Sequence, residues 1–266
     1  MCRCRALAAC FRSRGASPFR QTHRANGNTG RFLGRRDDAA VELMDDPGAD
    51  LDMLERTYGR FRLVNAVVSN PRAVYRRWIR PRLSPIETRR VLDIGTGGSD
   101  LPQAMLAWAR ADGLRLEVTA IDPDERAIAW ARRRPPVPGL VLRQVTSREL
   151  ADAGERFDVV TSNHVLHHLD GRELGALLAE SERLAAGGGL AVHGDIERSR
   201  LGYALFGIGT LPFAGNLLAD TFIRADGLTS IRRSHTAAEL RAVLPAGWRV
   251  RRGFPSRLEV IWGASG

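Results

Sequence analysis

The chain has 266 residues, a length that suits one large α/β domain with additions and allows a sizeable buried core. Its 40 basic residues are all arginine, and they outnumber the 30 acidic residues to give a net charge of +10. However, residues 1–36 hold nine arginines and no acid, which leaves 31 arginines against 30 acids beyond them. The near-neutral remainder argues against a nucleic-acid-binding face.

The arginine-rich head also contains all three cysteines, Cys2, Cys4 and Cys10. Three thiols cannot all pair within one chain, so we expect a reduced, cytoplasmic protein. Gly, Asn, Ser and Arg dominate this head and no apolar periodicity is present, so residues 1–40 are predicted to be a basic disordered extension. A transit peptide, or an upstream extension from a misplaced start codon, is the alternative.

Residues 41–85 are predicted to form an N-terminal helical cap. Leu51, Leu54, Tyr58 and Phe61 recur at steps of three and four after Asp50, a good helix-capping residue. A Pro at position 71 ends this helix, and a second helical segment runs to the Pro at position 81. Two helices therefore precede the first strand of a domain that spans residues 86–266.

Residues 91–100 read Val-Leu-Asp-Ile-Gly-Thr-Gly-Gly-Ser-Asp, which predicts a strand, a tight turn and a helix. Gly95 and Gly97 let the backbone turn sharply and let a nucleotide-like ligand approach the main-chain N–H groups. Asp100 stands where the dinucleotide fingerprint has its third glycine, and Asp93 would repel a phosphate. Both details weaken an NAD-binding interpretation.

This stretch resembles the glycine motif of the class I S-adenosylmethionine-dependent methyltransferases, in which an acidic residue precedes three alternating glycines. Asp93, Gly95 and Gly97 match that motif, while Ser99 replaces the third glycine. The resemblance implies S-adenosyl-L-methionine as cofactor, bound by Asp93, Gly95, Thr96 and Gly97. It also implies that the N-terminal helices close over a substrate pocket, although their aromatic residues could equally pack on the sheet. The alternative is a glycine turn without a ligand.

A second strand is predicted at Leu116–Ile121, followed by Asp122, Pro123 and Asp124. A carboxylate at this place can accept hydrogen bonds from both hydroxyls of a ribose, so Asp122 and Pro123 join the expected cofactor-binding residues. Asp122 could instead cap the next helix. The two roles are compatible only if Asp124 does the capping.

A third strand, residues 140–145, is followed by Thr146 and Ser147. The resembling family often has an acid there that binds the adenine amino group. The two hydroxyls therefore stand as candidates for that contact.

The fourth strand and its exit, residues 157–169, resemble the fourth motif of the branch that includes the ubiquinone and menaquinone methyltransferases. This likeness implies that Asn163 and His164 line the methionine part of the cofactor. His167 and His168 suggest a general base or a metal ligand, and His167 is a catalytic candidate. Adjacent residues on a helix point about 100° apart and would not easily share one ligand, so no metal site is predicted.

The fifth strand is predicted over residues 190–193, with Asp195 beyond it. Ligands bind outside the carboxyl ends of strands in open α/β sheets, so His193 and Asp195 are expected to face the acceptor. Either could take a proton from a phenol or a carbon acid. The alternative for Asp195 is an ion pair with Arg198 or Arg200.

Residues 201–219 form the most apolar stretch and reach the length of a membrane span. A span is rejected because two further strands must return to the same sheet. We expect a lid insertion near residues 199–230 that covers an apolar acceptor. An ordinary helix pair, or a lid with peripheral membrane contact, is the alternative.

Thr236 and Glu239 form a capping box at the start of another helix. Residues 248–254 and 257–262 then alternate as two antiparallel neighbours. The predicted fold is an α/β, Rossmann-like, seven-stranded and mostly parallel sheet with helices on both faces, whose last strand is antiparallel.

The resemblance implies that a methyl group passes from S-adenosylmethionine to a small acceptor by direct displacement, with acceleration from positioning and exclusion of water. The apolar lid suggests a phenolic, polyketide or isoprenoid-quinone-type acceptor. Nucleic acid is not an expected partner, and the sequence gives no oligomeric state. The alternatives are an RNA or protein methyltransferase and a non-catalytic protein that binds S-adenosylmethionine.

Overall fold

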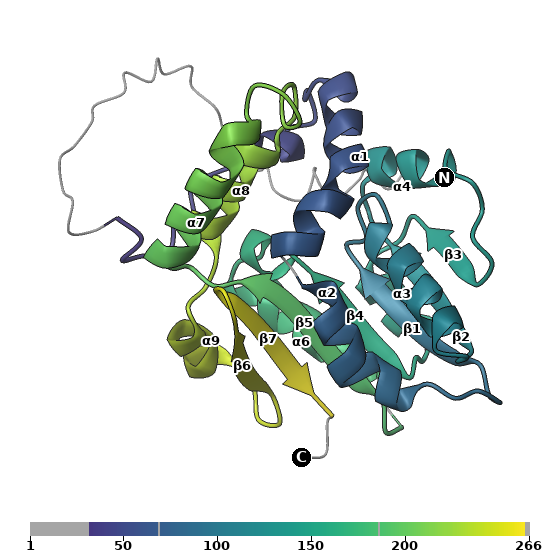
Figure 1. Cartoon of the computed structure of the whole chain (residues 1–266). Coiled ribbons are helices and arrows are strands. Elements are labelled where there is room, and N and C mark those ends of the chain that lie inside the picture. The colour runs from purple at the N-terminus through teal and green to yellow at the C-terminus, as the bar shows by residue number, and fades with distance from the viewer. Residues whose placement is uncertain (1–31, 69, 186, 264–266) are drawn as a thin grey trace, which may run out of the picture.

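The computed structural model describes residues 32–68, 70–185 and 187–263. Their centre is a seven-stranded sheet in the order β3-β2-β1-β4-β5-β7-β6 (Figure 1). The strands are β1 (Arg89–Ile94), β2 (Leu116–Ile121), β3 (Leu140–Arg143), β4 (Val159–Asn163), β5 (Leu190–Ile196), β6 (Arg249–Gly253) and β7 (Arg257–Trp262). The first five run parallel, and β7 is antiparallel to both β5 and β6. The predicted fold is confirmed.

The central strands are apolar runs because both faces of the sheet are covered. Val91, Leu92, Val159 and Val160 are fully buried. One face packs against α3 (Asp100–Ala111), α2 (Pro71–Val74) and the π-helical turn η3 (Tyr75–Ile79). The other face packs against α5 (Ser147–Asp152), α6 (Gly171–Leu184) and α9 (Ala237–Val243).

The helices begin where short polar side chains satisfy their first N–H groups. Asp124 caps α4 (Glu125–Arg132) by accepting a hydrogen bond from the Arg126 N–H. The predicted capping box of Thr236 and Glu239 is present at α9. Two further boxes, which the sequence analysis did not predict, begin α5 and α6.

A layer of helices stands above the carboxyl ends of the parallel strands (Figure 1). It consists of α1 (Leu51–Val68), α7 (Arg200–Thr210), the 3-10 turn η6 (Leu211–Phe213) and α8 (Ile223–Arg233). The Thr57 hydroxyl of α1 accepts a hydrogen bond from the Phe222 N–H at 3.0 Å. Arg60 donates to the carbonyls of Leu217 and Ala219. The N-terminal helix and the insertion after β5 therefore form one continuous cover.

Residues 32–40 correct the expected boundary of the N-terminal extension. They were predicted to be disordered up to residue 40, but they pack on the domain. The ring of Phe32 meets Tyr203 edge-on at a centroid distance of 4.9 Å. Arg36 donates to the carbonyls of His167 and Leu169 at 2.9 and 2.7 Å, so one guanidinium satisfies acceptors of the 3-10 turn η5 (Leu166–His168). The rest of the predicted extension, with its three cysteines, lies outside the described residues.

Among the helices that the structure describes, none is both long enough and apolar enough to cross a membrane.

Candidate active site

The glycine loop leaves β1 where the strand order changes direction, because β1 lies between β2 and β4. Open α/β sheets bind ligands at such a switch point. Gly95 has a φ of +69°, and a Cβ there would lie 2.6 Å from a methyl group of Val165, which follows β4. Only glycine fits both the backbone conformation and this close approach.

The N–H groups of Gly95, Thr96 and Gly97 in this loop are engaged within the protein. Gly95 and Thr96 donate to the Ile121 carbonyl at 2.9 and 3.0 Å. Gly97 donates to the Asp122 carboxylate at 2.9 Å. Asp100 then brings a negative charge to the first turn of α3. The loop is therefore not a phosphate cradle, unlike the anion sites at many helix N-termini.

Two carboxyl groups lie at the ends of β1 and β2, Asp93 fully buried and Asp122 partly buried. Burial, with a smaller contribution from the nearby Asp122 carboxylate, raises the pKa of Asp93 to about 7. Burial likewise raises the pKa of Asp122 to about 6. Each Asp122 oxygen accepts one backbone N–H, from Gly97 or Asp124, and keeps a second lone pair. A ligand with a cationic group and hydroxyl donors fits this pair, whereas a phosphate does not.

The condition under which Asp122 could bind a ribose, that Asp124 caps the next helix, is met. Asp124 caps α4, so Asp122, with Pro123 between them, is not needed as the cap. Tyr58 of α1 lies close by and is almost fully buried. Burial raises the pKa of the Tyr58 phenol, and the carboxylates of Asp124 and Asp122 add to this shift. The N-terminal helix thus covers the edge where the two carboxyl groups lie.

Thr146 and Ser147 use their hydroxyls within the protein. Thr146 caps α5 and pairs with Glu149, while the Ser147 hydroxyl donates to Glu180 at 2.6 Å. Neither contact supports the expectation that these residues bind an adenine amino group.

Asn163 and His164 lie at the exit of β4, as expected. The Asn163 side-chain oxygen accepts a hydrogen bond from Arg257 at 3.3 Å. His164 has a φ of +61°, which is uncommon for a residue other than glycine and concentrates at functional sites. Burial lowers the pKa of His164 to about 3, so its ring is neutral.

His167 and Asp195 form a buried pair at the same edge of the sheet. The His167 Nδ1 lies 2.7 Å from one Asp195 oxygen, and the His167 backbone N–H donates to the other at 2.8 Å. Burial lowers the pKa of His167, but the carboxylates of Asp195 and Glu42 outweigh this and raise it to about 10. The alternative ion pair of Asp195 with Arg198 or Arg200 is wrong for the described residues, since Asp195 pairs with His167 and Arg198 with Glu239.

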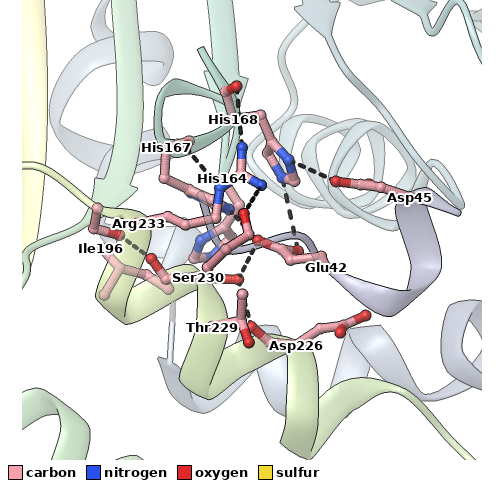
Figure 2. Close-up of polar contacts among 12 residues, drawn as sticks. Glu42, Asp45, His164, His167, His168, Ile196, Asp226, Thr229, Ser230 and Arg233 are labelled. Carbon is pink, nitrogen blue, oxygen red and sulfur yellow. Dashed lines mark hydrogen bonds and ion pairs between the residues drawn. The ribbon is translucent and has the colours of Figure 1, made fainter. Parts of the chain in front are cut away.

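Glu42 completes the cluster and was missed by the sequence analysis. It is 3% exposed and precedes the 3-10 turn η2 (Leu43–Asp45). Its two oxygens lie 3.3 Å from the His167 Nε2 and 3.8 Å from the His168 Nε2 (Figure 2). Burial raises the pKa of Glu42, but the two histidines and the Ser230 hydroxyl lower it to about 2. No motif links residue 42 to residues 167 and 168, so local sequence patterns could not reveal it.

The expectation that the two histidines point apart is also wrong. Their ring centroids are 4.3 Å apart, and both Nε2 atoms approach the same Glu42 carboxylate. The helical step sets the directions of the Cβ atoms, but rotation about two side-chain bonds sets where the ring nitrogens lie.

His193 does not lie with Asp195 and His167. The strand β5 continues to Ile196 instead of ending at His193, which places this histidine inside the sheet. Its Nδ1 lies 2.8 Å from the Ser162 hydroxyl, and its ring stacks on Trp248. Burial lowers the pKa of His193 to about 4. The position of His193 within the strand therefore corrects its expected place beside an acceptor.

Comparison with known proteins assigns the chain to a family. Residues 69–239 match the family model described as a methyltransferase domain. A ubiquinone biosynthesis O-methyltransferase of Rhizobium leguminosarum bv. trifolii (strain WSM2304) is 34% identical over 123 residues, which are 46% of each chain. Another from Cereibacter sphaeroides (strain ATCC 17025 / ATH 2.4.3) is 35% identical over 127 residues, 47% of this chain and 48% of that one. The chain thus spans about half the length of the curated relatives it matches.

A solved structure shows the same fold. Human N-acetylserotonin methyltransferase aligns with a TM-score of 0.55 at 12% identity, covering 80% of this chain and 56% of that one. The family model covers more than half of the chain, so the predicted methyltransferase resemblance is confirmed. The chain belongs to the methyltransferase domain family.

Proposed function

We propose that this protein transfers the methyl group of S-adenosylmethionine to a small apolar or aromatic acceptor. The observation that carries the proposal is a pair of carboxyl groups, the buried Asp93 and the partly buried Asp122, at the switch point of a methyltransferase-domain sheet. When bound, the cofactor supplies an electrophilic methyl group on a sulfonium, which departs as a neutral thioether. Most of the acceleration then comes from positioning and exclusion of water.

Different residues of the chain are proposed to bind different parts of the cofactor. Asp122 accepts hydrogen bonds from the ribose hydroxyls through its two remaining lone pairs. Asp93 stabilises the cationic methionine part, because a cation favours the charged form of a buried carboxyl. Gly95, Thr96 and Gly97 shape the loop between them. Pro123 lies beside Asp122, and Asn163 and His164 line the methionine end.

The acceptor is proposed to be a phenol of the quinone-precursor type, with its oxygen as the methylated atom. The relatives named ubiquinone biosynthesis O-methyltransferase support this choice, although each match covers only half of both chains. The cover above the sheet edge is apolar as well. Leu201, Leu205 and Ile208 are exposed at helical spacing along α7, which suits an apolar acceptor or a lid that rests on a membrane surface.

We further propose that none of the three expected catalytic residues acts as the general base. His167 is held as a cation between two carboxylates, and despite its burial the pKa of Asp195 is lowered by His167. His193 is enclosed in the sheet. We therefore propose that His167 and Asp195 organise this edge of the site rather than abstract a proton as an isolated pair.

The alternatives have less support. An RNA or protein methyltransferase would be expected to carry a basic surface, but the chain beyond residue 36 has 31 arginines and 30 acids. A non-catalytic binding protein would retain the carboxyl pair and differ only in failing to turn over.

The test is calorimetric titration of the full chain with S-adenosylmethionine, with its demethylated product and, in parallel, with NAD. We expect micromolar binding of the first two ligands alone. Asp122→Asn and Asp93→Asn should weaken it, while Asp152→Asn, at an exposed carboxylate paired with Arg183, should not. Transfer of a labelled methyl group to a catechol then tests turnover. Absence of binding by the folded native chain would overturn the proposal, and binding without transfer to any phenol would favour the non-catalytic alternative.

A further inference from the structure

The cluster of Glu42, His167 and His168 lacks the geometry of well-formed hydrogen bonds. The separations of 3.3 and 3.8 Å between the Glu42 oxygens and the two Nε2 atoms exceed the usual length of a charge-assisted hydrogen bond, about 2.7–2.9 Å. One ligand-type atom from each residue lies within 4.8 Å of the other two. Three such atoms therefore lie close to one another without forming short hydrogen bonds among themselves.

The spacing suits a metal ion. Zinc binds imidazole nitrogen and carboxylate oxygen at about 2.0–2.1 Å, so two ligands at a tetrahedral angle lie about 3.3–3.4 Å apart. The distance between the His167 Nε2 and the Glu42 oxygen is 3.3 Å. The second pair, at 3.8 Å, would need to close by about half an ångström. Two imidazoles and one carboxylate form a ligand set that divalent transition metals commonly use.

The groups around the cluster are arranged as outer-shell partners of a metal site. A metal-binding histidine usually donates its other ring N–H to a carboxylate, which fixes the ring and the tautomer. His167 places its Nδ1 2.7 Å from Asp195. His168 places its Nδ1 3.1 Å from Asp45 (Figure 2). Glu42 is oriented in the same way, because the Ser230 hydroxyl donates to it at 2.9 Å. Each of the three ligand candidates thus has its own orienting partner.

A second grouping, His164, His167 and Asp195, fits less well. The Asp195 oxygens already receive the His167 backbone N–H, the His167 ring and the Ile196 N–H at 2.7–2.8 Å. A carboxylate engaged in this way is better suited to orient a ligand than to be one.

We propose that Glu42, His167 and His168 bind a divalent transition-metal ion, with zinc as the best match. The ion would replace the Nε2 proton of the His167 cation, which is released to water, while Nδ1 keeps its proton toward Asp195. The three residues leave a coordination position open, as in catalytic zinc sites.

Both histidines follow the exit of β4, close in the chain to Asn163 and His164 at the proposed methionine end of the cofactor site, so an ion held here would lie near that end. An acceptor hydroxyl that binds at the open coordination position would lose its proton to water more readily, since a coordinated oxygen becomes more acidic. This last step rests on the proposed methyl-transfer function, whereas metal binding itself does not.

The test uses the full chain with Cys2, Cys4 and Cys10 all changed to serine, because three thiols would bind zinc by themselves. After removal of metals with a chelator, the protein is titrated calorimetrically with zinc, and separately with cobalt to record its visible absorption. We expect one saturable zinc per chain and the intense visible bands of four- or five-coordinate cobalt.

Three variants distinguish the proposed site from adventitious binding. Asp45→Asn should weaken zinc binding by about 10- to 100-fold, the usual effect of losing an outer-shell partner. Glu42→Gln and His168→Gln should weaken it further and change the cobalt spectrum. His168 is partly exposed, so its variant remains informative if Glu42→Gln fails to fold. Asp152→Asn serves as the surface control.

Two results would overturn the inference. One is the absence of saturable binding, which would leave His167 as a cation paired with two carboxylates. The other is binding that the folded His168→Gln variant leaves unchanged. Titration with S-adenosylmethionine in the same preparations separates the proposals. Cofactor binding without metal binding rejects only the metal site, and metal binding without cofactor binding rejects only the methyl-transfer function.

Discussion

At the scale of single residues, the site depends on Asp93, whose ionised form is unfavourable in its buried position until a cationic ligand binds. Its pKa of about 7 means that it is largely protonated below neutrality. A cationic methionine group binds the ionised form better, so binding of the cofactor releases a proton.

We expect the affinity for S-adenosylhomocysteine to rise with pH between pH 5.5 and 7 and then to level off. Below the pKa of about 7, each unit of pH should weaken binding by up to about tenfold, because one pKa unit corresponds to about 1.4 kcal/mol. Calorimetry at several pH values measures this. The Asp93→Asn variant should bind weakly with a flatter profile, and an unchanged profile would contradict the assignment.

The same raised pKa has a consequence for stability without ligand. A carboxyl group whose pKa is higher in the folded than in the unfolded state stabilises the fold below the unfolded pKa, and this contribution is lost as the pH rises through the folded value. The native chain should therefore lose thermal stability, relative to Asp93→Asn, as the pH rises from 4 toward 7. Parallel melting curves measure the difference, and curves with the same pH dependence would contradict it.

Gly95 and Gly97 offer a matched comparison within one loop. Both have positive φ, but a Cβ at Gly95 would meet Val165 at 2.6 Å, whereas none of the described atoms lies within 4 Å of one at Gly97. Gly97→Ala should lower the free energy of unfolding by about 1 kcal/mol from backbone strain. Gly95→Ala should cost about 1–3 kcal/mol more through overpacking. Urea denaturation measures both, and addition of Val165→Ala should recover part of the Gly95→Ala loss.

At the scale of elements, the cover depends on a few contacts between α1 and the segment that precedes α8. The Thr57 side chain is fully buried and accepts the Phe222 N–H while donating to the Met53 carbonyl. This hydroxyl joins two segments that are far apart in the sequence. Replacing the Thr57 hydroxyl alone therefore tests how much this hydrogen bond between the two segments contributes to stability.

Thr57→Val keeps the shape of the side chain but leaves the Phe222 N–H unpaired. We expect a loss of about 1–3 kcal/mol in the free energy of unfolding, the cost of an unsatisfied buried donor. Faster proteolysis between residues 211 and 222 should accompany it. Thr57→Ser retains the hydroxyl and should preserve the resistance to protease. Equal effects of the two variants would show that the methyl group, and not the hydrogen bond, matters.

At the scale of the whole molecule, Arg198 joins four parts of the chain. Its buried guanidinium donates to the carbonyls of Leu33 and Ser234 and to the Glu239 carboxylate. The arginine follows β5, and its partners belong to the N-terminal segment, the end of α8 and the first turn of α9. The Arg198 guanidinium therefore connects the cover, the sheet and the helices on the second face by hydrogen bonds.

Arg198→Met should lower the free energy of unfolding by about 1–3 kcal/mol, because the buried Ser234 carbonyl loses its donor, while the Glu239 carboxylate is partly exposed and can be solvated. Arg198→Lys should recover little, since an ammonium lacks the fork that reaches all three acceptors. Arg133→Met, at an exposed pair with Glu55, should cost less than about 1 kcal/mol. Chemical denaturation measures all three, and equal losses at Arg198 and Arg133 would contradict the argument.

The sheet, the glycine loop and the helix caps at Asp50 and Thr236 were predictable from the sequence. These features depend on neighbouring residues: alternation or apolar runs in the strands, glycine where φ is positive, and Thr236 three residues before Glu239. The carboxyl pair of Asp93 and Asp122 was also predictable, because parallel strands bring their carboxyl ends to one edge.

Only the tertiary structure decided which polar residues meet beyond that edge. Glu42 contacts His167 and His168, which lie more than a hundred residues further along the chain. Because β5 continues to Ile196, His193 is buried within the sheet, whereas Asp195 lies beside His167. Such contacts depend on how the N-terminal segment folds over the sheet. No periodicity in the sequence encodes that path, since the free energy that selects it comes from packing between distant segments.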